Sequence, residues 1–128
     1  MDLRESTDFR DLIDRARRNK EVLALILFGS YARGDFRSNS DIDLCIIGKK
    51  GSHFSDFSDL KGYSSERMDV VLFDNMSQVM RFKVLTEGEI LYVDDFRAFR
   101  EIRKKFVRSY LDYYPAMKRQ WKRMLKDV

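Results

Sequence analysis

The sequence predicts an α/β (α+β) domain in which helices flank a single mixed, twisted sheet. The main observation is an alternation along the chain: short apolar runs bounded by turn residues alternate with segments whose apolar residues recur every three or four positions. The second observation is the length, since 128 residues suit one domain and no linker-like stretch divides them. We therefore expect residues 1–128 to form a single domain with a helical tail at about residues 95–128.

Four segments are expected to form the strands, because each is short, apolar and bounded by turn residues. The first of them, from Val22 to Phe28, is wholly apolar and ends at Gly29, which predicts a strand that is buried on both faces. The expected strands are residues 22–28, 41–47, 68–73 and 90–93.

Five segments are expected to form helices. The first carries apolar residues at i, i+3, i+4 and i+7, behind capping side chains in residues 6–8. We expect Asn75 to cap the fourth helix, Gly88 to end it, and Pro115 either to kink the last helix or to begin another. The expected helices are residues 7–19, 30–33, about 54–60, 75–86 and 96 onward.

Composition limits the class of protein and of site. The single cysteine, Cys45, excludes an internal disulfide and is expected in the core, and the single histidine, His53, excludes a site that needs two histidines. The first residues lack the apolar core of a signal peptide, and the longest wholly apolar run is far too short to span a membrane. A cytoplasmic location without membrane attachment is therefore expected. The net charge of +4 suits an anionic ligand or partner.

The first candidate for chemistry is the turn Gly29–Ser30 after the first strand. A glycine lets a phosphate approach the backbone, and a serine hydroxyl with the free N–H groups of a short helix can donate to the phosphate oxygens. A plain strand-to-helix turn with serine as a cap is the alternative. Arg33 and Arg37 follow in the same segment, where a guanidinium would either neutralise phosphate charge or lie in solvent.

The second candidate is the pair Asp41 and Asp43 at the start of the second expected strand. Alternate side chains of a strand share a face, so both carboxylates would point the same way while Ile42 and its alternate neighbours enter the core. Two adjacent anions on an apolar strand are unfavourable unless a cation compensates, and Mg²⁺ prefers such hard oxygen ligands. The alternative is one aspartate at the strand entry and one at the surface.

Asp69 is the polar residue of the third expected strand. If this strand pairs beside the Asp41 strand, three carboxylates can converge, and such a set around two metal ions is a common arrangement for phosphoryl transfer. A residue at the edge of a strand in solvent is the alternative for Asp69.

These motifs together resemble a known family. Gly29–Ser30, followed after ten residues by Asp41-Ile42-Asp43, resembles the signature of the polymerase-β-like nucleotidyltransferase superfamily, and Tyr31 to Gly34 with Ser40 is similar to its small minimal nucleotidyltransferases of the MntA type. The resemblance is specific over residues 28–47 and weaker over residues 67–93. It implies the polymerase-β-like fold with a C-terminal helix.

The resemblance also implies roles. Asp41 and Asp43 would hold two Mg²⁺ ions, Asp69 would be the third carboxylate, and Gly29 and Ser30 would hold the outer phosphates of ATP. An acceptor hydroxyl would attack the α-phosphate and release pyrophosphate, with Asp69 as a candidate for taking the proton of the hydroxyl. Such a reaction depends on positioning and charge neutralisation more than on covalent chemistry.

The function that the resemblance implies is transfer of AMP from ATP to a hydroxyl, with a tyrosine of a HEPN-family toxin as the acceptor, so that the chain acts as an antitoxin by protein adenylylation. Two alternatives stay open: an antitoxin that neutralises its toxin by binding alone, and a nucleotidyltransferase for small molecules of the aminoglycoside type. The basic face of the C-terminal helix would serve contact with an acidic partner. Assembly with itself or with a partner is compatible with the sequence, and no motif that reads nucleic-acid bases is present.

Overall fold

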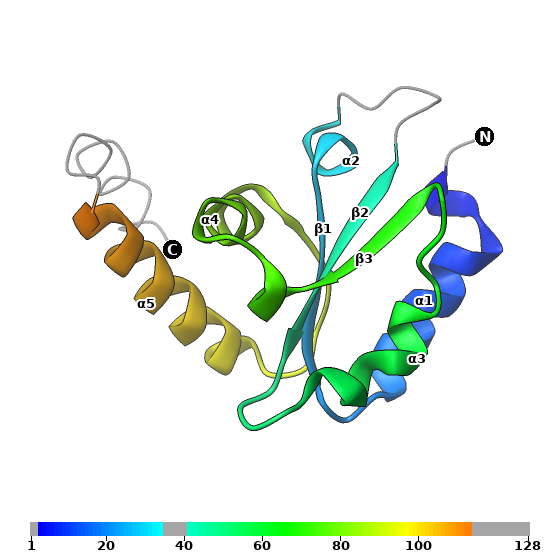
Figure 1. The fold of residues 1–128 in the computed structure, drawn as a ribbon, viewed down its shortest axis with the longest axis horizontal. Coiled ribbons are helices and arrows are strands. Elements are labelled where there is room, and N and C mark those ends of the chain that lie inside the picture. Colours follow the sequence, from blue (N-terminus) through cyan, green and yellow to red (C-terminus); the bar gives the residue numbers. More distant parts are fainter. Residues whose placement is uncertain (1–2, 35–40, 114–128) are drawn as a thin grey trace.

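The computed structural model describes residues 3–34 and 41–113, which form a four-stranded sheet with helices on both faces (Figure 1). The strands are β1 (Val22–Phe28), β2 (Ile42–Gly48), β3 (Met68–Leu72) and β4 (Glu89–Val93). The α-helices are α1 (Thr7–Arg18), α2 (Ser30–Arg33), α3 (Ser58–Lys61), α4 (Gln78–Glu87) and α5 (Phe96–Tyr113). Short 3₁₀ helices lie at η1 (Leu3–Glu5), η2 (Phe54–Phe57) and η3 (Phe73–Asn75).

The sheet is mixed, as predicted. Its strand order is β3-β2-β1-β4, in which β1 runs antiparallel to both of its neighbours while β2 and β3 run parallel. The parallel pair requires a crossover, which η2 and α3 provide between the end of β2 and the start of β3. As a result, β1 ends beside the beginnings of β2 and β3, which is where the candidate motifs lie.

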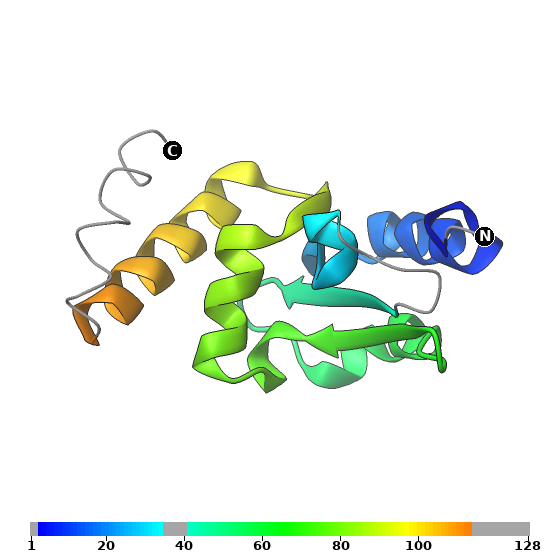
Figure 2. The same ribbon diagram turned by 90° about the horizontal axis from the view of Figure 1, so that it is seen from above.

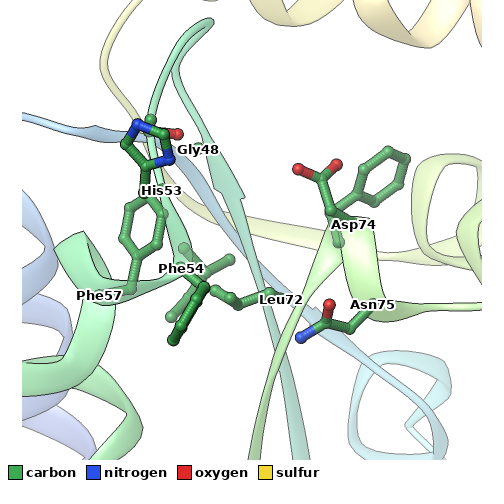
Figure 3. A pocket seen from close by; sticks show the side chains of 10 residues that line it. Gly48, His53, Phe54, Phe57, Leu72, Asp74 and Asn75 are labelled. Atoms are coloured by element: carbon green, nitrogen blue, oxygen red, sulfur yellow. The ribbon is translucent and has the colours of Figure 1, made fainter.

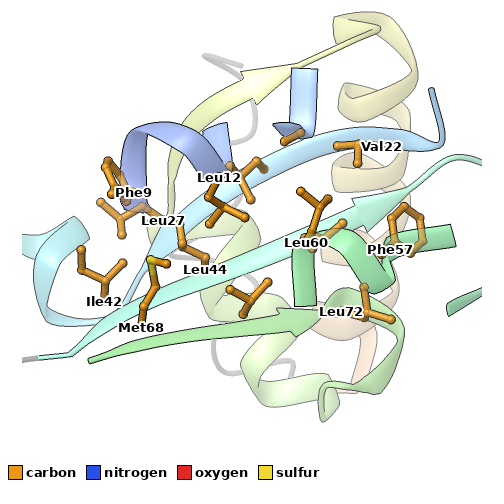
Figure 4. Close-up of a cluster of buried hydrophobic side chains, with 14 of the residues drawn as sticks. Phe9, Leu12, Val22, Leu27, Ile42, Leu44, Phe57, Leu60, Met68 and Leu72 are labelled. Carbon is orange, nitrogen blue, oxygen red and sulfur yellow. The ribbon is translucent and has the colours of Figure 1, made fainter. Parts of the chain in front are cut away.

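Each face of the sheet has its own apolar core. Helices α1 and α3 cover one face, where Leu12 and Leu60 pack against alternate residues of the strands (Figure 4). Helices α4 and α5 cover the other face, where Val84 and Phe99 pack against the opposite set (Figure 2). Every residue of β1 is buried because helices cover both of its faces, so the prediction for this strand is confirmed.

The amphipathic first helix is also confirmed. The backbone N–H of Phe9 donates to Oγ of Ser6 at 3.2 Å, so Ser6 is the cap and α1 begins at Thr7. At the other end of the chain, α5 lies against α4, where Phe82 and Tyr110 stack with ring centroids 4.3 Å apart. The predicted break at Pro115 and the tail beyond Tyr113 lie outside the described residues.

The predicted start of α4 was wrong by a few residues. Phe73, expected as the end of β3, and Asn75, expected as the cap, instead belong to the 3₁₀ turn η3. Ser77 caps the helix, because its Oγ accepts a hydrogen bond of 3.2 Å from the N–H of Met80. The extra turn carries residues 75–77 across the face of the sheet before the helix begins, where they line the candidate site.

Among the described residues, none of the helices combines the length and the apolar character that a membrane-spanning helix needs.

Gly88 is needed for close packing and not for an unusual backbone angle. It follows α4 in an extended conformation, and a Cβ added there would overlap Cγ2 of Ile26 and the carbonyl oxygen of Val84. We expect Gly88→Ala to lower the free energy of unfolding by about 1–3 kcal/mol, as overpacking does in other cores. Urea unfolding followed by circular dichroism measures this change.

Gly62 provides the matched control for this variant. It has ordinary helical backbone angles, and the atom nearest to an added Cβ is the carbonyl oxygen of Asp59 at 3.5 Å. Gly62→Ala should therefore change the free energy of unfolding by no more than about 1 kcal/mol, in the stabilising direction. Equal losses from both variants would contradict the packing role of Gly88.

Candidate active site

Asp43 and Asp69 lie side by side at the beginnings of two parallel strands. The register of β2 and β3 pairs Asp43 directly with Asp69, and neighbouring strands are about 4.8 Å apart. Asp43 shares a face of β2 with Cys45 and Ile47, which belong to the core beneath α4 and α5. Ile42, Leu44 and Ile46 enter the opposite core, as predicted. The two carboxylates therefore face the side of the sheet that α4 covers.

Gly29 brings the end of β1 against the same carboxylate. Phe28 pairs with Asp43 across the antiparallel ladder, and the next residue, Gly29, has a φ of +78° that L side chains rarely adopt. A Cβ added to Gly29 would lie 2.6 Å from Oδ2 of Asp43. The backbone angle favours glycine, and a larger residue would also displace the Asp43 carboxylate, so the two halves of the sequence motif meet in space.

The electrostatic environment of Asp43 disfavours its own charge. Burial is the largest cause that raises the pKa of Asp43 above its ordinary value of 3.8, and the neighbouring charges of Asp69 and then Asp41 raise it further. A bound cation would relieve all of these effects. Mg²⁺ is commonly held by one or two carboxylates together with phosphate oxygens, so Asp43 and Asp69 fit the donor set that this ion needs.

Asp41 is exposed and lies beside a basic residue, so its convergence with the other two carboxylates stays a prediction. β2 begins at Ile42, whose N–H donates to the carbonyl oxygen of Arg67 at 2.9 Å. This pairing places Arg67 beside Asp41, and its Nε lies 3.5 Å from Oδ1 of Asp41. Over residues 3–34 and 41–113, no three histidine, cysteine, aspartate or glutamate side chains gather closely enough to hold a metal ion. Arg67 is thus the basic neighbour of the exposed Asp41 carboxylate, whose charge still acts on Asp43.

A pocket of about 410 Å³ opens beside the carboxylate pair, within the volume range of small-molecule sites. Its lining includes the end of β1, both carboxylates and residues around the start of α4. The lining residues are Phe28, Gly29, Asp43, Asp69, Val71, Asn75, Met76, Ser77 and Met80. The pocket residues between 71 and 80 were not predicted as site residues, because only the path of η3 and α4 in front of the sheet brings them to the carboxylates.

A second pocket, of about 60 Å³, is too small for a nucleotide. His53 and Asp74 lie on opposite sides of it (Figure 3). His53 is exposed in the loop after β2, and its backbone N–H donates to Oδ2 of Asp56 at 2.8 Å. His53 is not part of the carboxylate pocket.

The remaining candidate residues divide into two groups. Cys45 is buried in the core, as predicted, and burial raises the pKa of its thiol, so it is an inert apolar residue. The side chains of Ser30 and Arg33 and the whole of Arg37 lie outside the part of the chain that the structure describes. Their roles in phosphate binding stay predictions.

We expect Asp43→Asn to stabilise the protein when no divalent cation is present. The raised pKa means that the ionised carboxylate opposes folding above that pKa, whereas near pH 3 Asp43 is protonated in both states and contributes nothing. At pH 7 the variant should melt above the wild type, and the difference should vanish near pH 3. Differential scanning calorimetry over this pH range measures it.

Asp94→Asn is the control of opposite sign. Hydrogen bonds from Lys49, at 2.9 Å, and from Tyr92 lower the pKa of Asp94, so its charge favours folding at neutral pH and that contribution is lost as the pH falls through its lowered pKa. This variant should melt below the wild type at pH 7. A fall in melting temperature for Asp43→Asn as well would contradict the repulsion inferred at the carboxylate pair.

Comparison with known proteins identifies the family. The family model for the polymerase-β nucleotidyltransferase domain matches residues 10–97. A Methanocaldococcus jannaschii protein named as a protein adenylyltransferase is 23% identical over 88 residues, which cover 64% of this chain and 70% of the relative.

Solved structures share the fold. A chain in the structure of a tri-AMPylated Shewanella oneidensis HEPN toxin in complex with an MNT antitoxin superposes with a TM-score of 0.54 and 20% identity, covering 94% of this chain and 95% of that one. A structure described as a minimal nucleotidyltransferase superposes with a TM-score of 0.51 and 28% identity, covering 70% of this chain and 95% of that one. With the family model matched over more than half of its length, the chain belongs to the polymerase-β nucleotidyltransferase family, as its motifs predicted.

Proposed function

We propose that this nucleotidyltransferase depends on Mg²⁺ and moves AMP from ATP to a hydroxyl group, and that the acceptor is a tyrosine of a HEPN-family toxin in the cytoplasm. The observation that carries the proposal is the position of Asp43, in register with Asp69 on one side and against the backbone of Gly29 on the other. This arrangement combines a two-carboxylate cation site with a turn that a phosphate can approach closely.

The reaction forms one bond and breaks one. The acceptor oxygen attacks the α-phosphorus of ATP, the bond from that phosphorus to the bridging oxygen breaks, and pyrophosphate leaves. Asp69 is exposed beside the pocket, where its carboxylate can take the proton of the hydroxyl. Mg²⁺, when bound by Asp43 and Asp69, would neutralise the charge that develops on the phosphate oxygens. Gly29, and Ser30 with it, would hold the outer phosphates.

Asp41 is proposed to join the site when Mg²⁺ and ATP are bound, which would complete the set of carboxylates for two ions. Its present partner is Arg67, and both side chains are about half exposed, at 45% for Arg67 and 55% for Asp41. An ion pair of this kind contributes only about 0.2–1 kcal/mol, so a divalent cation at Asp43 can compete for the carboxylate. Arg67 therefore works against metal binding in this proposal.

The proposed acceptor rests on the relatives. One relative is named as a protein adenylyltransferase, and a similar solved structure contains an AMPylated HEPN toxin beside an MNT antitoxin. The pocket beside Asp69 opens to solvent, so an acceptor side chain from another protein has access to it.

Neutralisation of a toxin by contact alone is the second candidate function, and the observation that favours it is the basic outer face of α5. That face carries exposed Arg97, Arg100, Lys105 and Arg108, which outnumber the exposed acids Glu101 and Asp112 on it. An acidic surface on a partner would complement this charge.

Asp43→Asn and Asp69→Asn should each reduce AMP transfer by about 10²-fold or more, because either change removes charge that the transition state requires. Incubation with labelled ATP, Mg²⁺ and the purified candidate toxin measures the transfer. Asp74→Asn is the control, since Asp74 is an exposed aspartate near the site that does not line the carboxylate pocket. Toxin neutralisation that survives Asp43→Asn in cells would favour the contact mechanism, and unchanged labelling by that variant would exclude the proposed chemistry.

The Arg67 proposal makes a prediction of its own. Asp41→Asn should raise the Mg²⁺ concentration for half-maximal transfer by at least about tenfold. Even residues that only hydrogen-bond to the ligands of a metal ion can change its affinity by this factor. Arg67→Ala should leave that concentration unchanged or lower it, because it removes the competing cation. Titration of the transfer rate with Mg²⁺ at saturating ATP distinguishes the two variants. A higher Mg²⁺ requirement for Arg67→Ala would show that Arg67 assists the site.

A further inference from the structure

The order of the site residues across the sheet indicates the side from which an acceptor enters. Gly29 follows β1, Asp43 lies on β2 and Asp69 on β3, in the same order as these strands lie in the sheet. In phosphoryl transfer, the attacking and leaving oxygens lie roughly in line on opposite sides of the phosphorus. With the outer phosphates at Gly29, pyrophosphate leaves on the β1 side, so the acceptor hydroxyl approaches from the β3 side.

Three apolar side chains line the same pocket as Asp69, together with the polar Asn75 and Ser77. Val71 lies two residues beyond Asp69 on the same face of β3, and Met76 and Met80 come from the segment that passes in front of the sheet. Both methionines are half-buried, pack against the core beneath α4 and also line the pocket. A carboxylate that accepts a proton thus lies next to a wall of two thioethers and an isopropyl group.

We infer that Val71, Met76 and Met80 form a subsite for the ring of a phenolic acceptor, so that the site selects an aromatic hydroxyl over an aliphatic one. This inference rests on the proposed function and adds the residues that choose the acceptor. Thioether groups make favourable contacts with aromatic rings. An aliphatic side-chain hydroxyl brings no ring to these three side chains and so gains none of this contact.

The chemistry of the transfer agrees with this subsite. A phenolic hydroxyl has a pKa near 10 and gives up its proton more readily than an aliphatic alcohol. In the step, the phenol oxygen forms its bond to the α-phosphorus, the bond to the bridging oxygen breaks with the electron pair leaving on pyrophosphate, and the proton passes to Asp69. A ring on Met76 and Met80 holds the oxygen beside that carboxylate.

Binding can be tested without AMP transfer. The full chain, with its methionine methyl groups labelled with ¹³C, would be titrated with N-acetyltyrosinamide and, separately, with N-acetylserinamide, and followed by NMR. We expect the tyrosine compound to shift the methyl signals of Met76 and Met80 by the ring current, while the buried Met68 signal stays in place and the serine compound has no effect. Absence of the shift at both Met76 and Met80, or equal shifts with both compounds, would overturn the inference.

Met80→Gln tests the subsite in the reaction. Glutamine has a side chain of similar length and is also a good helix former, but it lacks the apolar thioether surface. We expect it to lower kcat/KM for N-acetyltyrosinamide by about threefold to tenfold through the KM of the acceptor, with the KM of ATP unchanged. Met80→Leu should restore most of the loss. Val79→Gln is the matched control, since Val79 precedes Met80 on the same helix, is 46% exposed and does not line the pocket.

The outcomes separate the two proposals. A rise in the KM of ATP equal to that of the acceptor would place the nucleotide base on the methionine wall and overturn the inference. Methyl shifts with N-acetyltyrosinamide, but no transfer of AMP to it or to any protein, would leave the subsite standing and refute the proposed function.

Discussion

The site depends on the pairing of β2 with a neighbour on each side. Antiparallel pairing with β1 places Asp43 beside the end of that strand, and parallel pairing with β3 places it beside Asp69. A shift of the register of β2 by one residue would turn Asp43 into the core and move Ile42, Leu44 and Ile46 to the opposite face of the sheet.

Burial of each of these three apolar side chains contributes about 1.5–3 kcal/mol to the stability of the fold. Repulsion between two charges about 5 Å apart amounts to roughly 3 kcal/mol at an effective dielectric constant of about 20, and less when one is exposed. Apolar burial therefore holds the two carboxylates together against their repulsion.

The same region concentrates the features that oppose folding. Gly29 has a left-handed backbone angle, and Asp43 carries a charge that burial and two neighbouring carboxylates disfavour. Away from the site, local preference and global fold agree: Ser6 and Ser77 cap their helices, and β1 is apolar and buried. Unfavourable features that persist inside an otherwise consistent fold are typical of functional sites, where a ligand compensates for them.

Periodicity and spacing were sufficient for most of the fold, because the signals that define β1, α1 and the central part of β2 are local. The errors arose where a contact distant in sequence competed with a local pattern. The neighbour of Asp41 was not predicted, because pairing of β2 with the segment before β3 brings Arg67 to its side chain. Asn75 has the chemistry of a helix cap, yet the turn that follows β3 places Ser77 in that position.

The sequence by itself determined the candidate site residues. Asp43 and Asp69 are charged residues on apolar strands, and Gly29 ends another strand, so each stands out from its local pattern. It also determined the family, because the spacing of Gly29–Ser30 from Asp41 and Asp43 is specific. Only the tertiary structure decided that Asp43 and Asp69 are in register, that Asp41 pairs with Arg67, and that Met76 and Met80 face the carboxylates. The physical reason is that strand register and the path of a connecting segment are set by the burial of apolar side chains across the whole sheet, and this is a property of no single segment.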